Sequence, residues 1–119
     1  MDKNIETIKK YFELSDLASS DEKALTEIID LFAEDTSIKS GLSETATGKK
    51  EASEFFKTFF NRNKELKHLF KIESFTDYYQ AEWAVAGLKI DGSLFSLHGF
   101  DYYKFNDAGK ITSLVVNIS

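Results

Sequence analysis

Residues 99–116 read GFDYYKFNDAGKITSLVV, and this stretch decides the fold. Apolar and polar side chains alternate on both sides of NDAG at 106–109, which ends in a glycine suited to a positive φ angle. The pattern predicts two antiparallel strands, at about 94–106 and 110–118, joined by a short turn. One face of the first strand is apolar and aromatic apart from a single carboxylate, Asp101. That carboxylate is the first candidate for a functional group.

Two further long strands are predicted before this pair, at about 67–77 and 79–90. The second of them runs into Asp91-Gly92, the dipeptide preferred in tight hairpins. Consecutive strands joined by short turns predict an antiparallel meander. A shorter strand is expected earlier in the chain, at DTSIKS (residues 35–40).

Three amphipathic helices are expected in the first half of the chain. The first carries an apolar stripe with Tyr11 near its middle. The second begins with Ser19 and Glu22 at capping-box spacing and buries a face that ends at Phe32. The third spans GKKEASEFFKTFFNRN, where Phe55 and Phe59 belong to an i, i+3, i+4, i+7 series.

Helices followed by long strands predict an α+β fold in which three N-terminal helices pack in the concave face of a curved antiparallel sheet. Gly87 and Gly99 lie inside predicted strands and are expected to be bend points. Such a sheet can leave a conical hollow beside the helices. No repeat or flexible linker interrupts the pattern, so residues 1–119 are expected to form a single domain.

Composition excludes several functional classes. A net charge of −5 argues against a nucleic-acid or anionic-membrane partner, because both require a basic surface. The chain has no Cys, no transmembrane-length apolar run and no apolar signal-peptide core, so the expected location is cytoplasmic. No metal-ligand spacing and no phosphate-binding glycine loop is present, so neither a metal nor another cofactor is expected.

Four stretches taken in order resemble the nuclear-transport-factor-2-like (NTF2-like) superfamily, a cone-shaped α+β fold. They are KKYFELSD at 9–16, LFAEDTSIKS at 31–40, GKKEASEFF at 48–56 and GFDYYKFNDAGKITSL at 99–114. The superfamily includes ketosteroid isomerases, scytalone dehydratases and SnoaL-like polyketide cyclases. The resemblance covers nearly the whole chain and implies the fold more strongly than any one activity.

The resemblance also implies roles for particular residues. Tyr11 and Asp101 match the tyrosine and the protonated aspartate that form the oxyanion hole of ketosteroid isomerase. The catalytic base of that enzyme falls at Ser40, which has no useful basicity, so the isomerase activity is not carried over. His68 matches a position where many SnoaL-like proteins carry a histidine, which can act as an acid or a base near pH 7.

A mainly apolar cavity is expected around Asp101, whose burial would raise its pKa. From strand alternation we expect the inward face of the 79–90 strand to carry Glu82, Ala84, Ala86 and Leu88. Trp83 and Val85 are expected to point away. Tyr11, Asp101 and His68 are the catalytic candidates. The expected ligand-binding set is Phe32, Ser40, Phe55, Phe59, Glu82, Ala84, Ala86, Leu88, Leu97, Gly99, Leu114 and Val116.

Three functions stay open from the sequence. The first is a small-molecule-binding protein for an apolar or carbonyl-bearing ligand, with Tyr11 and Asp101 as polar anchors. The second is a cofactor-free lyase, isomerase or cyclase in which His68 or Glu82 moves a proton. The third is a non-catalytic interaction module whose cone is filled by its own side chains. His98, Phe100 and Tyr102 lie on the opposite face of their strand and predict a homodimer through the outer sheet face.

Overall fold

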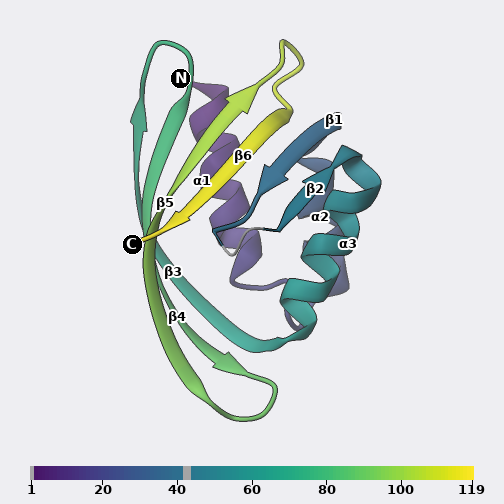
Figure 1. Cartoon of the computed structure of the whole chain (residues 1–119), viewed down its shortest axis with the longest axis vertical. Helices are drawn as coiled ribbons and strands as arrows, with labels where there is room; N and C mark the ends of the chain where they lie inside the picture. The colour runs from purple at the N-terminus through teal and green to yellow at the C-terminus, as the bar shows by residue number, and fades with distance from the viewer. Residues whose placement is uncertain (1, 42–43) are drawn as a thin grey trace.

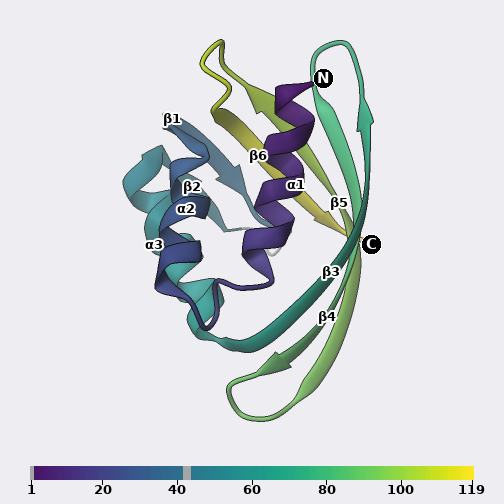
Figure 2. The ribbon, with the colours of Figure 1, turned by 180° about the vertical axis from the view of Figure 1, so that it is seen from behind.

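The computed structural model describes residues 2–41 and 44–119 as three helices and six strands (Figure 1). In chain order these are α1 (Lys3–Ser15), α2 (Glu22–Asp30), β1 (Phe32–Lys39), β2 (Thr45–Thr47), α3 (Gly48–Asn61), β3 (Asn63–Ser74), β4 (Tyr79–Lys89), β5 (Leu94–Phe105) and β6 (Ile111–Ile118). All three helices lie on one side of the sheet, and the long strands curve around them (Figure 2).

The strands form one six-stranded sheet in the order β2-β1-β6-β5-β4-β3. Strands β3 to β6 form the predicted antiparallel meander, with each strand hydrogen-bonded to the next. Strand β1 pairs in parallel with β6, so the sheet is mixed rather than purely antiparallel. The α+β architecture with helices in the concave face is confirmed.

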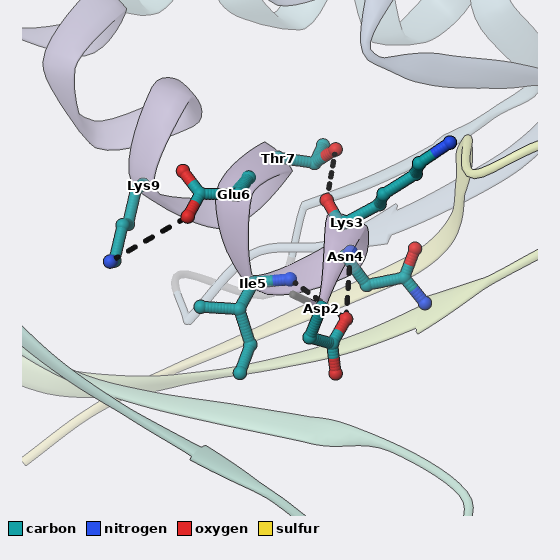
Figure 3. Close-up of polar contacts among 7 residues, drawn as sticks. All are labelled: Asp2, Lys3, Asn4, Ile5, Glu6, Thr7 and Lys9. Atoms are coloured by element: carbon teal, nitrogen blue, oxygen red, sulfur yellow. Dashed lines mark hydrogen bonds and ion pairs between the residues drawn. The ribbon is translucent and has the colours of Figure 1, made fainter.

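Aspartate side chains cap the first two helices. Asp2 accepts hydrogen bonds from the backbone N–H groups of Asn4 and Ile5, as Figure 3 shows. Asp21 does the same for α2. The predicted capping box starting at Ser19 is therefore wrong, because Asp21 is two residues closer to the first helical turn. Within the described residues, 2–41 and 44–119, no helix is long and apolar enough to cross a membrane.

Helical periodicity predicts that Phe32 continues the buried face of the second helix. In the structure Phe32 instead begins β1. The helix ends at Asp30 with Leu31 as its C-cap, and Phe32 is 1% exposed between the helices and the sheet. Its ring lies near those of Tyr11 and Phe56. A large apolar residue directly after a helix is buried equally well in either conformation, so periodicity could not separate the two.

The β4–β5 hairpin has a three-residue loop, residues 90–92, and not the two-residue turn that Asp91-Gly92 suggested. The backbone N–H of Lys89 donates to the Ser93 carbonyl, and Gly92 closes the loop with a φ of 90°. This extra residue pairs Ala81 with Asp101, where a two-residue turn would have paired Glu82 with it. A one-residue change of register moves every side chain of a strand to the other face of the sheet.

Two mid-strand glycines make room for aromatic rings. Gly99 pairs with Trp83 across the sheet, and Gly87 pairs with Phe95. A Cβ added at Gly99 would lie 2.6 Å from Trp83 Cζ2 and still closer to the carbonyl oxygen of Asn117. A Cβ at Gly87 would overlap the Phe95 ring. These glycines therefore permit close approach of a ring to the backbone.

Candidate functional site

A cavity of about 150 Å³ lies between the concave face of the sheet and helices α1 and α3. Some of its lining residues are buried and others are exposed to solvent; we call the buried part the floor and the exposed part the mouth. Buried residues form the floor, among them Phe12, Phe56, Leu66, Trp83 and Asp101. Exposed residues form the mouth: Gly41, Glu44, Arg62, Leu97 and Ile118.

Asp101 is 3% exposed on the floor of the cavity, and each of its carboxyl oxygens accepts a hydrogen bond. One carboxyl oxygen, Oδ1, accepts a hydrogen bond of 2.8 Å from Trp83 Nε1. The other, Oδ2, accepts one of 2.6 Å from the hydroxyl of Tyr103. Each donor is itself buried, so the orientation of the carboxyl group is fixed from both sides.

Burial raises the pKa of Asp101 to about 7. Desolvation is the larger effect, because removal from water disfavours the charged form, and the hydrogen bonds from Tyr103 and Trp83 oppose it only in part. Protonated and ionised Asp101 are therefore both populated near neutral pH. In the protonated form its carboxyl group can donate a hydrogen bond to an oxygen atom in the cavity.

Tyr11 contributes a phenol to the same cavity. Its ring packs edge-on against Tyr103, with centroids 6.0 Å apart, and burial together with the nearby Asp101 charge raises its pKa. Within the described part of the chain, no group hydrogen-bonds the Tyr11 hydroxyl. Because its pKa is raised, the Tyr11 hydroxyl is protonated at physiological pH. Its O–H donor is therefore available for a bound molecule.

His68 also lines the cavity, and its partner Asp16 was not anticipated from the sequence. The Nδ1 atom of His68 lies 2.7 Å from Asp16 Oδ1, which also accepts the backbone N–H of His68 at 3.0 Å. Desolvation lowers the pKa of His68, although Asp16 acts in the opposite direction. A neutral ring that donates through Nδ1 has Nε2 as its proton acceptor, the arrangement required of a general base.

The cavity brings together most, but not all, of the residues predicted to line it. Nine of them contribute to its wall: Tyr11, Ser40, Phe55, Phe59, His68, Leu97, Asp101, Leu114 and Val116. Phe32 is buried outside the wall, and Gly99 lies on the inward face of β5, where it pairs with Trp83. The catalytic and binding roles of these residues stay predictions.

The predicted inward face of β4 is wrong. Ala81, Trp83 and Val85 are buried on the concave side, whereas Ala84 and Ala86 are exposed on the outer face. Glu82 and Leu88 share that outer face by alternation. Glu82 instead bonds His98, whose Nε2 lies 2.8 Å from Glu82 Oε2. The three-residue hairpin loop is the cause, since it reverses the parity of β4 relative to β5.

Within residues 2–41 and 44–119, no group of three or more His, Cys, Asp or Glu side chains is arranged to hold a metal ion. The polar groups in and around the cavity include the Asp16–His68 pair, the buried carboxyl group of Asp101 and the phenols of Tyr11 and Tyr103. This set can position an oxygen-bearing molecule and exchange protons with it.

Comparison with known proteins gives matches only at the level of structure. A scan against protein-family models and a search of curated proteins each returned no match. An NTF2-like protein of unknown function from Exiguobacterium sp. 255-15 is 29% identical, with a TM-score of 0.85 over 95% of this chain and 98% of that chain. A second NTF2-like protein of unknown function, from Burkholderia pseudomallei, is 14% identical, with a TM-score of 0.81 over 100% and 92%.

An enzyme is also among the structurally similar proteins. SalBIII, an epoxide hydrolase/cyclase-like enzyme in pyran ring formation in the polyether salinomycin, is 17% identical, with a TM-score of 0.82 over 98% of this chain and 91% of that chain. At this identity the likeness concerns the fold alone. Taken with the architecture and the 29% identical relative, these matches show that the chain has the NTF2-like fold, as its resemblance to that superfamily predicts.

Proposed function

We propose that the chain is a SnoaL-like protein that binds a small, mainly apolar molecule carrying a carbonyl or hydroxyl oxygen. The observation that carries the proposal is the buried Asp101, held by Trp83 and Tyr103 in the wall of an apolar cavity that Tyr11 also lines. A protonated Asp101 and the Tyr11 phenol are two donors that suit one ligand oxygen. The aromatic wall suits the rest of the molecule.

The volume of the cavity limits the size of the ligand. Its volume of about 150 Å³ is the same as that of an engineered apolar cavity that binds benzene. The enclosed part of a ligand is therefore about one ring in size, and a fused four-ring steroid would not be enclosed. A cavity of this size also argues against the third function, in which the protein's own side chains fill the cone.

Acetophenone is expected to bind more tightly than ethylbenzene, its counterpart without the oxygen. Quenching of Trp83, the one tryptophan of the chain, reports binding because this residue lines the cavity. Tyr11→Phe should reduce the preference for acetophenone by about fivefold to tenfold, the effect of one hydrogen bond of about 1 to 1.4 kcal/mol. Tyr102→Phe, a matched change on the outer sheet face, should leave it unchanged. Equal affinity of the two probes for the unmodified protein would refute the proposed anchors.

A cofactor-free isomerase or lyase is the second candidate, and the Asp16–His68 pair favours it. The pair supplies an oriented base in the cavity, which Ser40, the residue that the resemblance matches to the isomerase base, also lines. His68 would remove a proton α to the ligand carbonyl, while Asp101 and Tyr11 hydrogen-bond the developing enolate oxygen. Conversion of 3-cyclohexenone to its conjugated isomer, followed by ultraviolet absorption, tests this role. Turnover lost in both His68→Gln and Asp16→Asn would support it, whereas binding without turnover would leave the binding function alone.

We also propose a homodimer formed through the outer sheet face. Leu69 is 79% exposed there and pairs with the outward-facing Ala84, and the half-buried Phe100 and Tyr102 share the same face. Association would remove this apolar surface from water. Light scattering should give twice the mass of one chain for the unmodified protein and a single-chain mass for Leu69→Lys with Phe100→Glu. A monomer at high micromolar concentration would exclude the dimer.

A further inference from the structure

The mouth of the cavity carries charge, although the interior is largely apolar. Arg62, the one arginine of the chain, and Glu44 are the charged residues among the exposed lining residues of the described chain. They come from different segments: Arg62 follows α3, and Glu44 precedes β2. The cavity therefore has two chemically distinct ends, with hydrogen-bond donors at the floor and charge at the mouth.

The backbone of Arg62 is fixed, while its guanidinium has no partner in the described chain. The residue is the C-cap of α3, and its N–H donates to the carbonyls of Phe59 and Phe60. Its own carbonyl accepts the N–H of Ile90 at 3.1 Å, which ties the end of the helix to the β4–β5 hairpin. Lys49 lies within 4 Å of Asp30 and Glu34, whereas Arg62 makes no ion pair with any described residue. A rigid attachment point thus presents an unpaired cation beside an apolar cavity.

We propose that Arg62 binds a carboxylate of the ligand at the mouth of the cavity. The inference rests on the proposed function and narrows it: the ligand is an amphipathic acid about one ring wide, with a carbonyl or hydroxyl oxygen at the floor and a carboxylate at the mouth. A guanidinium has the planar, forked donor geometry that matches a carboxylate through two parallel hydrogen bonds. Arginine suits this task better than lysine.

The remaining charges sharpen the specificity of such a site. The whole protein carries a net charge of −5, which repels anions in general, so an acid would be held only where a local cation compensates. Glu44 disfavours a carboxylate on its own part of the mouth and leaves Arg62 as the place to bind. A purely dipolar role of Arg62 at the C-terminal end of α3 would affect stability but would not distinguish acids from amides.

The test compares 4-oxo-4-phenylbutanoate with its neutral amide, using Trp83 fluorescence. The two probes share a ring and a ketone and differ in charge at one end. The acid should bind the unmodified protein about three to ten times more tightly than the amide. Arg62→Gln should abolish this difference by weakening the acid alone, and Arg62→Lys should restore part of it. Lys64→Gln, the same change of charge at an exposed residue outside the cavity wall, is the matched control and should have no effect.

Each outcome separates the carboxylate site from the proposed function. Failure of both probes and of acetophenone to bind would overturn both. Binding of acid and amide with equal affinity, unchanged by Arg62→Gln, would overturn the carboxylate site and leave the binding function in place. An equal loss of acid binding in Lys64→Gln would also overturn it, because the effect would then come from overall charge.

Discussion

Asp101→Asn is expected to stabilise the protein at pH 8 by up to about 4 kcal/mol and to have little effect at pH 4. The pKa of Asp101 is raised from 3.8 to about 7 by burial, and each pKa unit corresponds to about 1.4 kcal/mol. Between these values the unfolded chain loses this proton and the folded chain keeps it. Stability from this group is therefore complete below about pH 4 and is lost as the pH rises towards 7. An amide cannot ionise, so the variant escapes that loss.

Urea unfolding at several pH values measures this effect. The difference in unfolding free energy between Asp101→Asn and the unmodified protein should grow from pH 4 to pH 7 and then level off. Asp107→Asn, an exposed change in the β5–β6 turn, should give a constant difference. If the difference for Asp101→Asn does not change with pH, then Asp101 is not a buried group that ionises near neutrality.

Gly99→Ala is expected to lower the free energy of unfolding by about 3 kcal/mol. The new Cβ would meet the carbonyl oxygen of Asn117, which belongs to the neighbouring strand, and Trp83 Cζ2 at 2.6 Å. Neither obstacle can move freely, because the Asn117 carbonyl is part of the β5–β6 backbone pairing and the Trp83 indole is held by Asp101. The change should also shift the fluorescence of Trp83. Thermal unfolding and an emission spectrum measure both consequences.

Gly87→Ala is the matched control for this prediction. Its Cβ would meet the ring of the half-buried Phe95 and lie 3.0 Å from Leu66 Cδ2, so the obstacles at Gly87 are side chains and not a backbone carbonyl. The expected cost is about 1 kcal/mol, with little change in Trp83 emission. Equal losses of stability at the two positions would show that the Asn117 carbonyl does not obstruct a side chain at Gly99 more than a movable ring does at Gly87.

The architecture could be predicted from the sequence because it depends on periodicity. Helical spacing in the first half and alternation in the second identify the helices and the long strands without knowledge of their contacts. The pairing of β1 with β6 could not be predicted in this way. Strands β1 and β6 are distant in sequence, so no short turn indicates that they are neighbours. The short apolar alternation of β1 does not show which strand it pairs with.

The candidate site was only partly predictable, because it depends on register and on contacts between distant residues. The inward direction of Asp101 follows correctly from the alternation within its own strand. The predicted direction of Trp83 is wrong because one residue in the 90–92 loop decides the parity of β4 relative to β5. Asp16 lies at the end of α1, and no local pattern indicated that it would meet His68 across the fold. A carboxylate at a helix end is ordinarily solvated, so nothing in its sequence context distinguished it.

The parallel pairing of β1 with β6 has a consequence for how the chain reaches its folded state. That one pairing joins β1 and β2 to the rest of the sheet, and one of its members is the last strand of the chain. During synthesis β1 can pair with β2 early, but its other edge must wait for almost all of the second half of the chain before it meets β6. Contacts of such long sequence separation slow folding. In the interval β1 and β5 each present an open hydrogen-bonding edge, where association with other chains competes with arrival of the last strand.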